Sequence, residues 1–131
     1  MKFSEMPYAR PNVEAVKSEL KGLTEALENA KSYSEAKEIF LKKETLLKKV
    51  YTLSTLVSIR HSIDTRDEFY DNEEKFWNAA GPELEEYTQN WTAAMLKSPF
   101  RKDFADEYGD IMFVNAEISL KTFSAKIISD L

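Results

Sequence analysis

Residues 32–63 read SYSEAKEIFLKKETLLKKVYTLSTLVSIRHSI, with no glycine or proline among them. Ser32 and Glu35 match the S-x-x-E capping box, in which the two side chains satisfy otherwise unpaired backbone N–H groups of a first helical turn. Apolar residues follow at helical spacing: Ile39, Leu46, Val50, Leu53, Leu56 and Val57, with Phe40, Leu47 and Tyr51 beside them. This pattern predicts one long helix, which we expect to form the centre of the domain.

The sequence before this segment predicts an extended lead-in and one helix. Pro7 and Pro11 each disfavour helical geometry in the preceding residue, so residues 1–11 are expected to be extended or irregular. Asn12 offers a side-chain oxygen to the free N–H groups of a starting helix. Residues 13–30 then continue with an apolar stripe, which predicts the first helix.

Turn signals divide the sequence after residue 63. Residues 65–68 match a second capping box, T-x-x-E, and the Gly-Pro pair at 81–82 is typical of a break followed by a new helix start. Gly109 favours the end of a short helix. The expected helices span residues 13–30, 32–63, 66–80, 82–96, 99–108 and 110–123, with a further start at Ser124. We predict an all-α fold, an antiparallel bundle of helical hairpins with about six helices.

Composition excludes several kinds of site. The chain has 131 residues, no cysteine and one histidine, so it holds no disulfide scaffold, no cysteine-ligated metal site and no H-E-x-x-H zinc motif. A formal net charge of −5 gives no support to nucleic-acid binding, which depends on lysine and arginine contacts to phosphates. No apolar run approaches the roughly 18 residues of a membrane helix. We expect a single soluble, cytoplasmic domain without a membrane or nucleic-acid partner.

The one histidine lies in a polar segment where the long helix is expected to end. Arg60 and Asp64 are four residues apart and His61 and Asp64 three, so on a helix the carboxylate reaches either cation. His61 is therefore either a general base oriented by Asp64 or a member of a structural polar joint. In the second interpretation Arg60, His61, Asp64 and Asp67 share hydrogen bonds where the chain reverses, and we favour it because spacing places no second reactive group nearby.

Two further patterns have a functional and a structural interpretation. The adjacent carboxylates Glu73-Glu74 and Glu85-Glu86 suggest acid–base pairs, but neighbouring residues on a helix diverge by about 100°, so we expect surface positions. A set of aromatic residues is suited either to stacking on a ligand or to a core: Tyr70, Phe76, Trp77, Tyr87 and Trp91. Their helical spacing favours the core.

The last residues start an apolar face that the chain is too short to complete. Ile127, Ile128 and Leu131 share one side of a helix with about two turns available, and so short a helix is marginal unless it packs or continues. We therefore expect Leu131 to be a point of truncation.

Three stretches are distinctive when read as letters: MKFSEMPYARPN at residues 1–12, LVSIRHSIDTRDEFY at 56–70 and LKTFS at 120–124. They resemble the N-terminal region of bacterial oligoendopeptidase F-type zinc metallopeptidases, relatives of thimet oligopeptidase, and the second stretch is the most specific. Ala125-Lys126 follows the third where relatives often have Pro-Glu. The family's enzymes are several times longer, and their H-E-x-x-H motif and downstream glutamate ligand have no counterpart in this sequence.

The resemblance implies that residues 1–131 form one N-terminal helical domain of such a peptidase. In the family, a helical shell encloses a channel for short peptides, zinc activates water, and the motif glutamate acts as general base. The implied partners are the zinc-bearing C-terminal catalytic domain and short peptide substrates, and this domain would wall the channel. No residue here receives a catalytic or metal-binding role, and a channel-side position for His61 stays open. The alternative is a stand-alone α-helical protein-interaction module without enzymatic activity.

Overall fold

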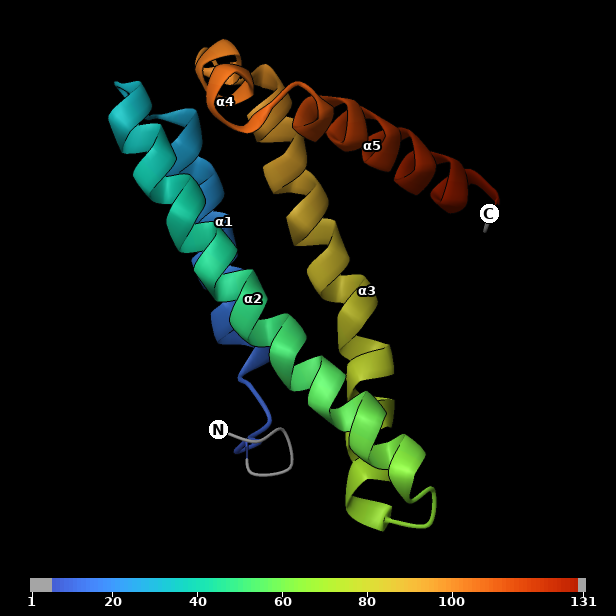
Figure 1. Cartoon of the computed structure of the whole chain (residues 1–131). Coiled ribbons are helices and arrows are strands. Elements are labelled where there is room, and N and C mark those ends of the chain that lie inside the picture. Colours follow the sequence, from blue (N-terminus) through green and yellow to red (C-terminus); the bar gives the residue numbers. More distant parts are fainter. Residues whose placement is uncertain (1–5, 130–131) are drawn as a thin grey trace.

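The computed structural model describes the backbone of residues 6–129 and the side chains of residues 6–122. Within this part the chain forms five α-helices and no strand (Figure 1). They are α1 (Val13–Glu28), α2 (Tyr33–Ile63), α3 (Glu68–Lys97), α4 (Arg101–Tyr108) and α5 (Ile111–Ser129). The predicted all-α fold is confirmed, with five helices among the described residues where about six were expected.

The two longest helices, α2 and α3, form an antiparallel hairpin that runs the length of the molecule (Figure 1). A short turn at residues 64–67 joins them. α1 packs against both α2 and α3. α4 lies at the end of the hairpin where α3 finishes, and α5 diverges from α3 from this corner (Figure 1).

The helix starts show why these segments are helical. The Ser32 hydroxyl accepts a hydrogen bond from the Glu35 amide at 3.1 Å, and the Asn12 side chain accepts one from the Ala15 amide at 3.1 Å, so both predicted caps are confirmed. The start of α3 differs from the prediction. Asp67 caps it, accepting from two amides of the first turn, so α3 begins at Glu68 and not at residue 66.

The predicted break at residues 81–82 is wrong, because α3 continues through both. Gly81 lacks the side-chain atom that would clash with the following proline ring. Pro82 removes one helical hydrogen bond, which would have reached the carbonyl of Asn78, and these residues are exposed, so water can bind that carbonyl. Trp77 and Leu84, on the opposite side, are both buried, and their packing keeps the helix continuous.

Two further boundaries also differ from the prediction. α4 begins at Arg101, two residues later than expected, and ends as predicted at Gly109, whose φ is 97°. The expected new start at Ser124 is wrong, because α5 runs unbroken from Ile111 to Ser129. The apolar face predicted for Ile127, Ile128 and Leu131 lies outside the residues whose side chains are described.

One apolar cluster receives side chains from every one of the five helices. Its buried members are Leu20 and Leu27 from α1, Ala36, Ile39, Phe40 and Leu47 from α2, Trp91 and Met95 from α3, Phe104 from α4 and Phe113 from α5. Phe104 is completely buried, and its ring centroid lies 5.0 Å from that of Tyr33 and 5.5 Å from that of Phe40. We call this set the five-helix cluster.

A second, smaller apolar cluster lies nearer the α2–α3 turn. It contains Val16, Val50, Val57, Trp77 and Leu84, from α1, α2 and α3. The aromatic residues therefore have the predicted core role: Trp77 and Trp91 are buried, and the other three are partly buried and pack against the clusters. No helix among the described residues is long and apolar enough to cross a membrane.

Substituting two glycines tests the backbone geometry. Gly22 is inside α1 with open space around the position of a Cβ, so Gly22→Ala is expected to raise the free energy of unfolding by about 0.5–1 kcal/mol. Gly109 has φ 97° and ψ 150°, so Gly109→Ala is expected to lower it by about 1–3 kcal/mol. Chemical denaturation of both variants checks this, and a stabilising Gly109→Ala would contradict the described α4 end.

Candidate functional site

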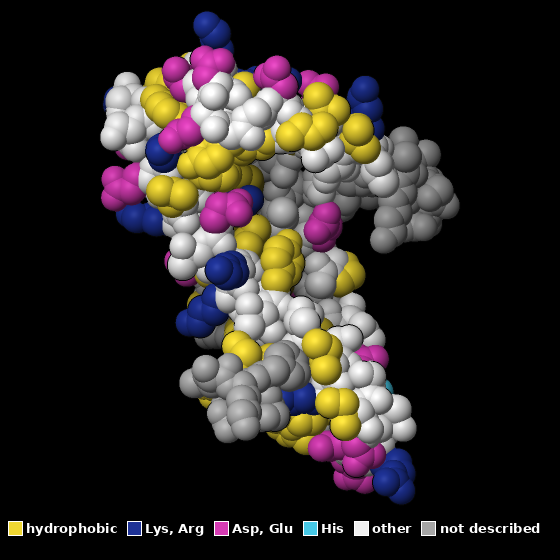
Figure 2. All heavy atoms as spheres, in the orientation of Figure 1, with side chains coloured by type: hydrophobic (Ala, Val, Ile, Leu, Met, Phe, Trp, Pro, Cys, Tyr) yellow, Lys and Arg dark blue, Asp and Glu magenta, His cyan; other side chains and the backbone are white. Residues whose placement is uncertain are grey.

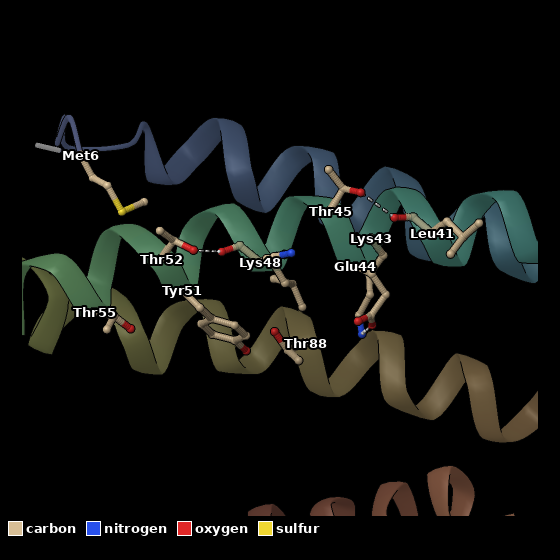
Figure 3. Close-up of a pocket in the computed structure, with 11 residues that line it drawn as sticks. Met6, Leu41, Lys43, Glu44, Thr45, Lys48, Tyr51, Thr52, Thr55 and Thr88 are labelled. Atoms are coloured by element: carbon tan, nitrogen blue, oxygen red, sulfur yellow. Dashed lines mark hydrogen bonds and ion pairs between the residues drawn. The ribbon is translucent and has the colours of Figure 1, made fainter. Parts of the chain in front are cut away.

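A groove of about 740 Å³ runs along the side of α2 that faces away from α1 (Figure 3). It is lined mainly by α2 residues between Leu41 and Thr55, with Met6 of the lead-in at one end and Thr88 of α3 opposite. Figure 3 shows the Tyr51 ring pointing from α2 toward Thr88. The groove is open to solvent.

Four threonines supply most of the short polar side chains of this groove, and three of their hydroxyls donate within their own helix. Thr45, Thr52 and Thr88 each donate to the backbone carbonyl four residues earlier, at 2.8–3.0 Å. Such hydrogen bonds turn the hydroxyl proton toward the helix. Beside the threonine methyl groups and the Tyr51 ring, the groove carries the hydroxyls of Tyr51 and Thr55 and the ammonium of Lys48.

Positive and negative charge meet in the groove at Lys43 and Glu44. The Lys43 ammonium lies 2.9 Å from the Glu44 carboxylate and 5.5 Å from the Trp91 ring centroid. Both residues also line a second groove of about 410 Å³ between α2, α3 and α5. The two grooves therefore adjoin at this ion pair, and the second ends against Met112 and Ala116 of α5.

The predicted polar joint at the α2–α3 turn forms contacts different from the expected pairs. The Arg60 guanidinium donates to the Tyr70 hydroxyl at 3.0 Å and to the Met6 carbonyl at 2.6 Å. Asp64 accepts from the Arg66 amide at 3.0 Å, and Asp67 caps α3. The four predicted residues thus lie around one turn and connect it to both α3 and the lead-in.

His61 lies between two carboxylates of α3. Its Nδ1 is 2.5 Å from Glu74 Oε2, and its Nε2 is 3.5 Å from Asp71 Oδ1. The expected partner Asp64 is not among the carboxylates within ion-pair distance of the ring. Among the described side chains no serine, threonine or tyrosine hydroxyl is hydrogen-bonded to His61, so the geometry builds no nucleophile–base pair.

A buried polar network fastens the lead-in to α3. Glu73 is only 4% exposed. Its carboxylate accepts a hydrogen bond from the Tyr8 hydroxyl at 2.6 Å. Arg10 Nε lies 3.0 Å and 3.1 Å from the two carboxylate oxygens, and a terminal nitrogen of the Arg10 guanidinium also donates to the carboxylate. Trp77 Nε1 donates to the Tyr8 oxygen at 3.1 Å. The expectation that Glu73 is a surface residue is therefore wrong, because its charge is paired on both oxygens.

This network shifts two pKa values. Hydrogen bonds from Arg10 hold the pKa of Glu73 below its ordinary value, against the effect of burial. Burial, followed by the hydrogen bond to Glu73, raises the pKa of Tyr8 to about 12. With these pKa values, the Glu73 carboxylate is ionised and the Tyr8 phenol is neutral at neutral pH.

A comparison with known protein families shows to which family the chain belongs. A family profile described as "Peptidase M3 N-terminal domain" matches residues 3–123. The chain belongs to this family. Among curated proteins, no significant match was found.

Solved structures support the assignment to the M3 N-terminal domain. The chain is 33% identical to PZ peptidase A, solved with an inhibitor, and superposes with a TM-score of 0.91 over 98% of this chain and 23% of that one. It is 34% identical to a protein assigned as oligoendopeptidase F from Bacillus anthracis str. Ames, with a TM-score of 0.92 over 99% of this chain and 24% of that one. The chain therefore spans about a quarter of the length of these relatives.

The zinc that the resemblance implies is expected in the catalytic domain, and the described residues of this M3 N-terminal domain do not fit it. The two carboxylates near His61 approach opposite nitrogens of its ring, so they cannot share one ion with a single ring nitrogen. Residues 6–122 contain no group of three His, Cys, Asp or Glu side chains arranged for a metal. No step of peptide hydrolysis is assigned to these residues.

The Glu73 network predicts a pH-dependent stability. The carboxyl pKa is below its ordinary 4.5 in the folded domain, so ionised Glu73 stabilises the fold above that pH, and this stabilisation is lost as the pH falls below it. Glu73→Gln is therefore expected to lower the free energy of unfolding by about 1–3 kcal/mol at pH 7. The difference from wild type should be smaller at a pH below 4.5 than at pH 7, as measured by urea denaturation at both pH values.

The matched control is Glu86→Gln, an exposed glutamate of the same helix. It should change stability by less than about 0.5 kcal/mol at either pH. A Glu73→Gln difference that grew on acidification would contradict the assigned charge state of the network.

Proposed function

We propose that the chain is the non-catalytic N-terminal helical domain of a zinc-dependent oligoendopeptidase that hydrolyses short peptides. The observation that carries this proposal is the match of nearly the whole chain to about a quarter of known peptidase structures, at 32–34% identity. The remaining three quarters of such an enzyme would contain the catalytic domain. We place the enzyme in the cytoplasm, as the sequence predicts.

The groove along α2 is the proposed contribution of this domain to the peptide channel. Its methyl and aromatic lining offers apolar contact without demanding particular hydrogen bonds, which suits peptides of varied sequence. The charges of Lys43 and Glu44 are paired, and Lys48 leaves the groove with one positive charge. In this role the domain limits the size of the peptides that fit in the channel by steric exclusion, and it takes no part in the reaction.

The catalytic domain supplies the chemistry in this proposal. Zinc bound there polarises the scissile carbonyl and activates water. The residues around Arg60, His61, Asp64 and Asp67 have a structural role, holding α2, α3 and the lead-in at one end of the hairpin. Their contacts to Tyr70, Glu74 and Met6 support that role.

The first test compares the chain with a longer product. Purified residues 1–131 are expected neither to hydrolyse peptides nor to bind zinc tightly, because the described residues hold no metal site. A product that includes the catalytic domain should do both, as shown by peptide cleavage with and without a chelator and by metal analysis. Zinc-dependent cleavage by residues 1–131 alone would contradict the proposal.

Sequencing the coding DNA past Leu131 distinguishes the two hypotheses. An open reading frame that reaches H-E-x-x-H is expected of the peptidase, and a stop codon is expected of the interaction module.

The second test fills the groove. In the longer enzyme Thr55→Trp, at a groove-lining position of α2, is expected to raise KM for the longest accepted peptides by about three- to tenfold while leaving kcat for the shortest unchanged. Steady-state kinetics on peptides of graded length measure this.

The matched control is Lys42→Trp, which places the same bulk on α2 at a side chain that is 64% exposed and lies outside the groove. It should leave both constants unchanged for every length. Equal effects of the two substitutions would show that the α2 groove does not meet substrate.

A further inference from the structure

Three large aliphatic side chains are exposed in one row on α5. Ile111 is 63% exposed, Val114 47% and Ile118 57%. Their spacing of three and four residues places them on one side of the helix. In Figure 2 hydrophobic side chains are visible over the first part of α5, at the upper right of the molecule. We call Ile111, Val114 and Ile118 the α5 row.

The opposite side of α5 is also apolar, and it is already packed. Phe113 is 3% exposed and belongs to the five-helix cluster, and Met112 packs against that cluster. α5 contacts α3 and α4 from this side. A helix with apolar residues on two opposite sides is typical of one that is buried on both, whereas the described side chains of α5 are covered on one side.

The α5 row carries no negative charge, although the chain has 23 acidic residues and a net charge of −5. The one carboxylate between Ile111 and Lys121 is Glu117. It is turned toward α4, where it pairs with Arg101 at 2.8 Å. Depletion of charge at an exposed apolar surface is the compositional mark of the core of an interface.

The greater length of the relatives bears on what could cover the α5 row. This chain corresponds to 23–24% of their chains, and its family profile is that of the N-terminal domain. A second copy of the chain is a poor occupant, because a stable interface between separate molecules uses roughly 20–30 residues a side. A small surface is sufficient within one chain, because the covalent link gives a high effective concentration.

We propose that the α5 row is the surface on which the catalytic part of an M3-type peptidase docks. This inference rests on the proposed function and adds to it the place of contact. Docking there buries the exposed side of α5 and leaves both grooves open, because none of the three residues of the α5 row lines either groove.

The experiment uses a whole enzyme, the Bacillus anthracis oligoendopeptidase F relative, in which residues 1–131 of this chain replace the matching N-terminal domain. Hydrogen exchange of the α5 amides is measured in this chimera and in the isolated chain, together with hydrolysis of a short peptide. Exchange of the α5 amides is expected to slow by at least about tenfold in the chimera. Ile118→Asp should abolish that slowing and lower the peptidase activity.

The matched control is Ile63→Asp, the same substitution at a residue that is 78% exposed at the α2–α3 turn. It should leave α5 exchange and activity unchanged, and neither substitution should alter the thermal unfolding of the isolated chain, since both side chains are exposed. Equal effects of the two in the chimera would overturn the assignment to the α5 row.

The remaining outcomes separate the two proposals. An active chimera without slower α5 exchange overturns the docking surface and leaves the proposed function standing. Slower α5 exchange in a chimera that does not cleave peptides supports docking and overturns the proposed function. A chimera with neither slower α5 exchange nor peptide cleavage counts against both proposals.

The oligomeric state of the isolated chain is measured by size-exclusion chromatography with light scattering. A dimer that becomes monomeric with Ile118→Asp would make a second copy of the chain the occupant and overturn the inference.

Discussion

The five-helix cluster is the contact on which the architecture depends. Two long helices joined by a short turn would form only a hairpin, and the other three helices gain fixed positions because each places an apolar side chain in the same cluster. Phe104 is the clearest case. It is the one buried residue of the eight-residue α4, and a helix that short has little stability apart from such packing. Phe113 similarly attaches α5 at the corner, which sets the direction in which α5 leaves.

The opposite end of the hairpin is held by polar contacts beside the smaller apolar cluster. Glu73 is buried with its charge paired to Arg10, and Tyr8 connects the same carboxylate to Trp77. A buried carboxylate is costly unless it is fully paired, so the network requires the lead-in to lie in one place. Arg60 adds a second link through the Met6 carbonyl. Met6 is thereby placed at one end of the α2 groove, which connects the polar network to the shape of that surface.

Members of the M3 N-terminal domain family keep this fold while their sequences diverge. TM-scores of 0.90–0.92 at 32–34% identity show that the same backbone is kept with about two thirds of the residues changed. The proposed roles of groove wall and docking helix require only a certain shape and an apolar surface, and many sequences provide both. In the roles proposed for them, the exposed row on α5 and the two grooves act against other parts of a longer enzyme.

Local sequence patterns determined the helix limits and the fold class of a large part of this protein. Spacing and caps gave α2 its limits, the shortage of glycine and proline indicated an all-α fold, and one histidine without cysteine excluded a zinc motif. These are properties of neighbouring residues, which a sequence records directly. The tertiary structure decided the rest: α3 passes through Gly81-Pro82 because Trp77 and Leu84 are buried on its other side, and Glu73 is buried because Tyr8 and Arg10 reach it from more than sixty positions away. Contacts between distant segments have no periodicity along the chain, so no local signal distinguished Glu73 from an exposed glutamate.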